Sequence, residues 1–184
     1  MTNIQTKLDY LYQEMQKEEF LKQRGLGNEV PYFIFDYDPK DELIIRSSVD
    51  RFLKKLPIKV LHIDLFRLML EQFEEIGLDN LFALEAEEGT EELFDAMKPS
   101  LHPRDITQQI ADRIEDHQVI FLTRIGSVYP LIRSHEILNN LAERKIKIPV
   151  VVFYPGSFSG LDLKLFNKFS SQGYYRAFAI DERV

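Results

Sequence analysis

The sequence at residues 32–41 reads YFIFDYDPKD, and it predicts a buried strand followed directly by a helix. Residues 32–37 form a nearly continuous run of large apolar and aromatic side chains, which is typical of a strand buried on both faces of a sheet. Asp38 can cap the following helix, with Pro39 at its first position and Asp41 three residues after the cap. The apolar periodicity extends this helix to about Leu56.

The alternation of strands and helices continues along the chain. Further strands are predicted at residues 59–63, 118–123, 149–154 and 174–180. Asp64 can cap the helix after the second strand, whose buried stripe is expected to hold Phe66, Met69, Leu70, Phe73 and Ile76. Pro155-Gly156 is expected to stop the fourth strand. The order of elements predicts a three-layer α/β fold, with a mostly parallel sheet of about five strands and helices on both faces.

The chain is expected to form one domain over residues 1–184. An amphipathic helix is predicted at 2–23, with Thr2 as a possible cap. Residues 78–101 are acidic and helical in character, so they are expected to form a helical insertion outside the sheet. The apolar residues between 161 and 169 are too densely spaced for a simple solvated helix.

Composition excludes several classes of protein. The chain has no Cys, which removes disulfides, thiolate metal sites and thiol nucleophiles. Its net charge of −7, with basic residues scattered among acids, disfavours direct nucleic-acid binding. The first 20 residues lack the apolar core of a signal peptide, and the longest apolar run, at 148–154, is too short to span a membrane. A cytoplasmic protein without membrane partners is therefore expected.

We expect any catalytic or ligand-binding residues at the strand ends, because ligands of such folds bind at the carboxyl ends of the strands. The phosphate-loop and dinucleotide motifs GxxxxGK[ST] and GxGxxG occur nowhere, and neither does HExxH or GxSxG. Asp36, Asp38 and Asp64 fall near strand ends and leave two interpretations open. They can form a magnesium site or supply a general base, or they can serve as helix caps and a polar strand end. We predict no catalytic residue, metal or cofactor.

Four segments stand out together: GLGNEVP at 25–31, VYPLIRSH at 128–135, FYPG at 153–156 and YYRAF at 174–178. In this order and spacing they resemble the BrxB family of BREX bacteriophage-exclusion systems, over about residues 20–180. Arg124 stands where the family pattern has glycine, which weakens any backbone-binding role of that turn. Residues 78–101 match only loosely.

The resemblance implies a small defence component encoded beside a PglZ-type protein, an adenine-specific DNA methyltransferase and a large ATPase. It also implies a nucleotide-binding type of α/β fold that lacks the phosphate loop. The expected function is that of a non-catalytic adaptor that binds the PglZ-type partner and possibly the other components. The alternatives are a metal-assisted hydrolase or nuclease that uses Asp36, Asp38 and Asp64, and a sensor that binds nucleotide without hydrolysing it.

Five residues of the family segments carry head groups that core packing does not need. As exposed Tyr and Arg often anchor interfaces, the candidates for partner contact are Tyr129, Arg133, His135, Tyr154 and Arg176. Buried hydrogen bonds or salt bridges are the alternative role for these side chains.

Overall fold

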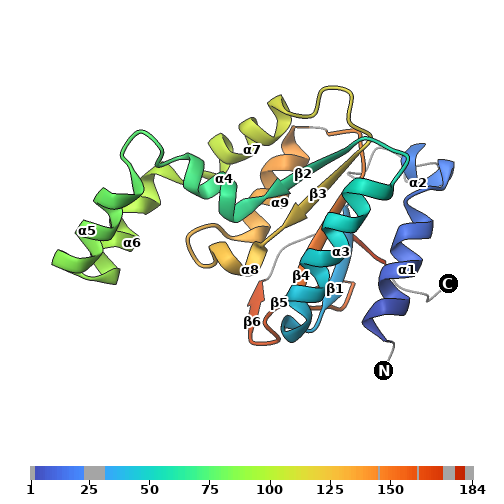
Figure 1. Ribbon diagram of the computed structural model, residues 1–184, viewed down its shortest axis with the longest axis horizontal. Helices are drawn as coiled ribbons and strands as arrows, with labels where there is room; N and C mark the ends of the chain where they lie inside the picture. The colour runs from blue at the N-terminus through green and yellow to red at the C-terminus, as the bar shows by residue number, and fades with distance from the viewer. Residues whose placement is uncertain (1–2, 23–31, 145, 161, 172–176, 181–184) are drawn as a thin grey trace.

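A sheet of seven strands organises the computed structural model, which describes residues 3–22, 32–144, 146–160, 162–171 and 177–180 (Figure 1). Five strands follow the order β2-β3-β4-β1-β7, and each neighbouring pair is parallel. Their bounds are β1 (Tyr32–Tyr37), β2 (Val60–Asp64), β3 (Val119–Thr123), β4 (Val150–Phe158) and β7 (Ala177–Ala179). The short strands β5 (Leu163–Leu165) and β6 (Phe169–Ser171) continue β4 in antiparallel pairing. The predicted fold class is confirmed.

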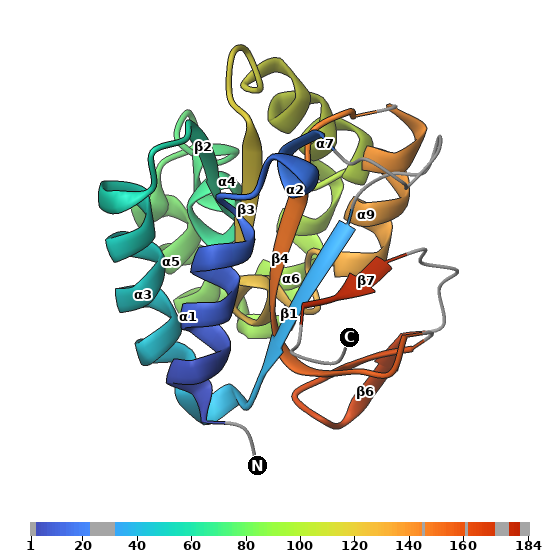
Figure 2. The ribbon, with the colours of Figure 1, turned by 90° about the vertical axis from the view of Figure 1, so that its right-hand side faces the viewer.

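Helices cover both faces of this sheet (Figure 2). One face carries α1 (Ile4–Glu14) and α3 (Glu42–Lys55), and α2 (Glu18–Lys22) lies beside them. The other face carries α4 (Leu65–Glu71), α7 (Pro103–Asp112), α8 (Ile125–Val128) and α9 (Ser134–Glu143). This division follows from right-handed crossovers: the step from β1 to β2 runs across the sheet in one direction, and the steps through β3 to β4 return in the other.

The core is divided by the alternation of side chains along the strands. Ile34, Leu122 and Val152 point into the cluster under α4, α7, α8 and α9. Their neighbours Phe35, Phe121 and Phe153 point into the cluster under α1 and α3. The rings of Phe35 and Phe121 lie 5.6 and 5.3 Å from that of Phe153, so one aromatic row joins three adjacent strands.

The predicted caps are confirmed at the start of two helical segments. Asp38 accepts a hydrogen bond from the backbone N–H of Lys40 and begins the 3₁₀ turn η1 (Pro39–Asp41), which leads into α3. Asp64 accepts from the backbone N–H of Arg67 at 3.0 Å and caps α4. Both residues therefore satisfy helix N–H groups that would otherwise lack a partner.

Three expectations about element bounds were wrong. The helix predicted at 2–23 ends at Glu14, a turn separates it from α2, and its cap is Asn3; residues 1, 2 and 23 lie outside the described part. Helix α4 ends at Glu71, so Ile76 falls outside the predicted stripe and is 50% exposed.

The third wrong bound is that of the fourth strand, since β4 continues through Pro155-Gly156 to Phe158. Pro155 still pairs in register with Tyr37 of β1, and at Gly156 the pairing changes to β5. A Cβ at Gly156 would lie 2.1 Å from the carbonyl oxygen of Lys164. Glycine thus allows the close approach of β5 and does not end the strand.

Residues 78–100 lie outside the sheet as two helices and a 3₁₀ turn. These are α5 (Leu78–Glu88), α6 (Thr90–Met97) and η2 (Lys98–Ser100). Helices α5 and α6 pack against each other and extend away from the layers of the sheet (Figure 1).

Replacement of Phe153 by alanine tests the aromatic row. Phe153→Ala removes a fully buried ring that contacts rings on both adjacent strands, and we expect a loss of about 3–5 kcal/mol in the free energy of unfolding. Urea denaturation followed by circular dichroism measures it. The control Leu43→Ala, at a side chain 72% exposed on α3, should change stability by less than about 0.5 kcal/mol. Equal effects of the two substitutions would contradict the assignment of this core.

Candidate functional site

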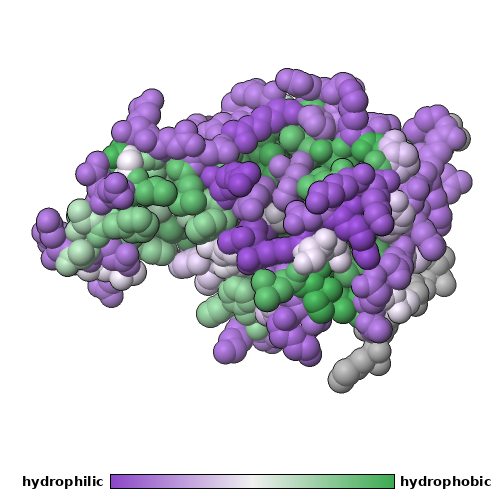
Figure 3. Space-filling view, viewed as in Figure 1, coloured by the Kyte–Doolittle hydropathy of each residue, from purple (hydrophilic) through white to green (hydrophobic). Residues whose placement is uncertain are grey.

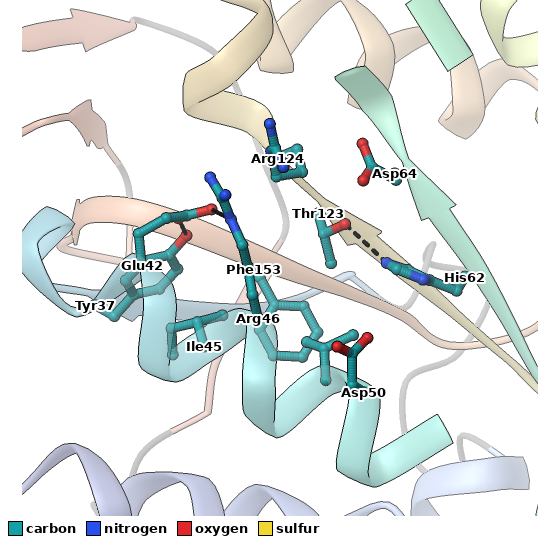
Figure 4. A pocket seen from close by; sticks show the side chains of 11 residues that line it. Tyr37, Glu42, Ile45, Arg46, Asp50, His62, Asp64, Thr123, Arg124 and Phe153 are labelled. Atoms are coloured by element: carbon teal, nitrogen blue, oxygen red, sulfur yellow. Dashed lines mark hydrogen bonds and ion pairs between the residues drawn. The ribbon is translucent and has the colours of Figure 1, made fainter. Parts of the chain in front are cut away.

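A cavity of about 210 Å³ opens at the carboxyl ends of the strands (Figure 4). It lies where the chain diverges: β1 continues into α3 on one face of the sheet, and β3 continues through Arg124 into α8 on the other. Such a divergence creates a crevice in open α/β sheets. Ile45, Val49 and Phe153 form the apolar part of its wall. The polar part comprises Tyr37, Glu42, Arg46, Asp50, His62, Asp64, Thr123 and Arg124.

Several of these polar groups are paired with each other. The Tyr37 hydroxyl donates to one oxygen of Glu42, and the other oxygen accepts from Arg46 Nε at 2.8 Å. Burial raises the pKa of Tyr37, so the hydroxyl keeps the proton that it donates. On the other side of the cavity, His62 Nε2 lies 2.9 Å from Thr123 Oγ1 and forms a hydrogen bond that joins β2 to β3. These contacts tie neighbouring elements together.

The backbone conformation and contacts of Arg124 show how an arginine is accommodated where the family pattern has glycine. Its backbone has φ 63° and ψ 27°, in the left-handed region that glycine adopts at the lowest cost. Its Nε donates to Ser127 Oγ at 2.9 Å, and its guanidinium lies over the ring of Phe66 at 5.1 Å. Both contacts offset the cost of a side chain at this turn.

The three candidate aspartates do not form one site. Asp38 is exposed, caps η1 and pairs with Lys40 Nζ at 2.8 Å, and the bond to Lys40 lowers its pKa. Asp64 lines the cavity and caps α4. Asp36 forms an ion pair with Lys7 and accepts from the backbone N–H of Phe158 at 3.1 Å.

Each of these carboxylates therefore has a local structural task. Within the described ranges, no three His, Asp or Glu side chains gather in a group that could hold a metal ion. The geometry that metal-assisted hydrolysis requires is not formed by the residues proposed for it.

A second site lies where the start of α9 meets β6. The rings of Tyr129 and Phe169 are 5.2 Å apart, and Phe169 is 47% exposed. Arg133 is exposed immediately before α9, and His135 is half-buried in its first turn. We name the set of Tyr129, Arg133, His135 and Phe169 the Tyr129–Phe169 surface. Sequence reasoning missed Phe169, because its dense apolar neighbourhood indicated core packing.

Tyr154 does not belong to that surface, which corrects its assignment as a partner contact. Its side chain is 1% exposed, and its hydroxyl faces Ser134 at the start of α9 and Ser171 of β6. Burial raises the pKa of Tyr154 to about 12. This large polar residue is thus buried beneath α9 and β6. Arg176 lies outside the described residues.

The comparisons with known proteins agree with one another. A family model described as "BREX protein BrxB" matches residues 61–180. A protein named BREX protein BrxB from Bacillus cereus is 35% identical over 192 residues, which cover 100% of both chains. One of the same name from Escherichia coli is 30% identical over 182 residues, which cover 96% of this chain and 91% of that one.

No solved structure matches the chain. No helix in the described part is both long and apolar enough to cross a membrane.

The pH dependence of stability tests the placement of His62. Burial lowers the pKa of His62 from its usual 6.5, so the unfolded chain takes up a proton at a higher pH than the folded protein does. Stability is therefore expected to fall as the pH drops below about 6.5. Urea denaturation at several values between pH 7.5 and 5.5 measures this loss, which His62→Gln should reduce.

The matched control is His135→Gln, which removes an imidazole from α9 and leaves His62 in place. It should keep the loss of stability at low pH. An unchanged pH profile in His62→Gln would show that this histidine does not contribute.

Proposed function

The chain belongs to the BrxB family of the BREX phage-defence system, and we propose that it serves there as a non-catalytic adaptor. The observation that carries this proposal is the Tyr129–Phe169 surface, where the exposed side chains of Arg133 and Phe169 lie with half-buried Tyr129 and His135. Tyrosine and arginine are frequent anchors of protein interfaces. The neighbouring polar groups at the strand ends mainly hold helices and strands together, as the Tyr37–Glu42–Arg46 and His62–Thr123 contacts illustrate.

The support beneath the surface favours binding. Tyr154 is buried beneath the start of α9 and β6, with its hydroxyl facing Ser134 and Ser171, so Arg133 and Phe169 extend from packed backbone. Less conformational entropy is then lost when a partner binds. A site that works by rigid presentation of side chains needs no reactive group.

We propose the PglZ-type BREX protein as the first partner, with the methyltransferase and the large ATPase as further contacts. Support comes from family membership, because a component of a multi-protein system without a catalytic constellation has its most direct role in assembly. The cytoplasm is the proposed location, since the partners that modify and recognise DNA act there.

A nucleotide sensor is the second candidate, and the cavity favours it. Arg46 and Arg124 stand at its wall and can meet phosphate oxygens. However, Glu42, Asp50 and Asp64 share the same wall and repel a phosphate. The adaptor function is therefore the stronger proposal.

The adaptor function predicts a complex that depends on the Tyr129–Phe169 surface. An affinity-tagged chain, expressed in a host that carries the rest of its BREX system, should retain the PglZ-type protein at about 0.1 M salt. Arg133→Glu should weaken the purified pair at least tenfold in Kd, because it reverses the charge of an interface anchor. Biolayer interferometry measures the affinity.

Arg104→Glu is the matched control, since it makes the same substitution at an exposed residue in the first turn of α7. It should leave the Kd within a factor of two. If the unmodified chain retains no BREX protein, the adaptor function is wrong; if Arg133→Glu binds as tightly as the unmodified chain, only the proposed surface is wrong.

Direct DNA binding is expected to be weak or absent. Non-specific binding depends on clustered Lys and Arg that neutralise phosphates, whereas this chain has a net charge of −7. Fluorescence anisotropy with duplex and single-stranded oligonucleotides at about 0.15 M salt should show no saturation below roughly 10 μM protein. Salt-sensitive binding at sub-micromolar concentration by the protein alone would contradict this expectation. It would show that this chain contacts DNA directly.

A further inference from the structure

The hairpin formed by α5 and α6 projects from the body of the molecule (Figure 1). Gly77 and Gly89, with φ of +85° and +97°, precede its two helices and provide turns that other residues rarely adopt. Leu81 and Met97 are the buried side chains that anchor the hairpin to the core. Most of the remaining hairpin surface is open to solvent, so its side chains are available for contact.

An apolar strip runs along the start of this hairpin. Phe82 is 62% exposed, Leu78 40% and the preceding Ile76 50%. Leu78 and Phe82 are four residues apart in α5, which puts them on one face of the helix. Figure 3 shows hydrophobic side chains gathered over the hairpin end of the molecule, with hydrophilic ones around them. Exposure of a phenylalanine beside two aliphatic side chains contributes nothing to the fold of a lone chain.

Charge is segregated onto the same hairpin. Seven acidic residues and no Lys, Arg or His lie between Gly77 and Lys98, in the hairpin itself. The rest of the chain then holds 23 basic and 23 acidic residues, so a body without net charge carries an arm with a charge of −7. Among the described residues, none of the acids from Glu74 to Asp95 forms an ion pair. No basic side chain in the described ranges neutralises their charge.

We propose that the α5–α6 hairpin docks into an apolar pocket rimmed by Lys and Arg on another BREX protein. This proposal rests on the adaptor function and adds a second contact site, built on a different element from the Tyr129–Phe169 surface. Phe82 supplies the apolar anchor, and the acids around it select a basic rim. The complementary charges also speed association, an effect that falls as salt rises.

A second copy of this chain fits the hairpin less well. A symmetric dimer through the apolar strip would bring two arms of charge −7 together, since such an interface uses the same patch on both subunits. The repulsion between like charges opposes that arrangement. A partner with a basic surface removes this cost and uses both features of the hairpin.

Two variants of the full chain test the proposal. Phe82→Ser removes the anchor, and the double variant Glu87→Lys/Glu91→Lys reverses two exposed charges of the hairpin. The readout is the amount of each BREX protein that co-purifies with the tagged chain from the intact system at about 0.1 M salt. Both variants should lose at least one BREX protein about tenfold relative to the unmodified chain. Retention of that protein by the unmodified chain should also fall as salt rises to about 0.5 M.

The control variants make the same kinds of substitution on other helices. Leu43→Ser removes a more exposed apolar side chain, on α3, and Glu19→Lys/Glu143→Lys makes the same charge change on α2 and α9. Both should retain every partner, and circular dichroism melts should show that all variants fold.

The outcomes separate the two proposals. If the unmodified chain retains no BREX protein, the adaptor function fails. If it retains partners and the hairpin variants retain them equally, the adaptor function stands and the docking role of the hairpin is wrong. Light scattering that shows a dimer of the unmodified chain and a monomer of Phe82→Ser would assign the hairpin to a second copy and would also overturn the proposal.

Discussion

The parallel pairing of β1 with β4 is the contact on which the other parts of the structure depend. The two strands run side by side over six register positions, from Tyr32 opposite Val150 to Tyr37 opposite Pro155. Both strands bury side chains in the two core clusters, so helices have to cover both faces of the sheet. Because alternate residues point in opposite directions, the aromatic row around Phe153 meets α1 and α3, while Val152 and Tyr154 meet the helices of the other face.

The same pairing also brings polar residues together at one edge of the sheet. Parallel strands end at one edge of the sheet, so Tyr37, Asp64 and Thr123 meet there around a cavity. In this protein the Tyr37–Glu42–Arg46 chain of contacts and the His62–Thr123 bond join elements across the sheet edge. These contacts therefore strengthen the edge of the sheet, as the proposed assembly role requires of a scaffold.

The two surfaces proposed for partners differ in physical character. The Tyr129–Phe169 surface is aromatic and carries Arg133, and it lies over the buried side chain of Tyr154. The α5–α6 hairpin is acidic and projects from the body on few buried side chains. An adaptor with one rigid surface and one charged arm can hold two proteins, or two parts of one protein, and a contact at one site then raises the effective concentration at the other.

The amino-acid pattern by itself determined the fold class, the core of each main strand and the caps at Asp38 and Asp64. These features depend on neighbours within a few residues: the period of the apolar side chains and a carboxylate beside a helix N–H group. Family membership was also visible in the sequence, because the segments that carry it are short and ordered.

Only the tertiary structure decided which polar residues are buried. Tyr154 looks like an interface anchor from its type, yet it is 1% exposed, because the segments that contain Ser134 and Ser171, 20 residues before it and 17 after it, pack over it. Phe169 looks like core and is exposed. The course of β4 past Gly156 likewise depends on the approach of Lys164. Burial depends on contacts between residues that are distant in the sequence. Local periodicity does not show which distant segment will pack against a given residue.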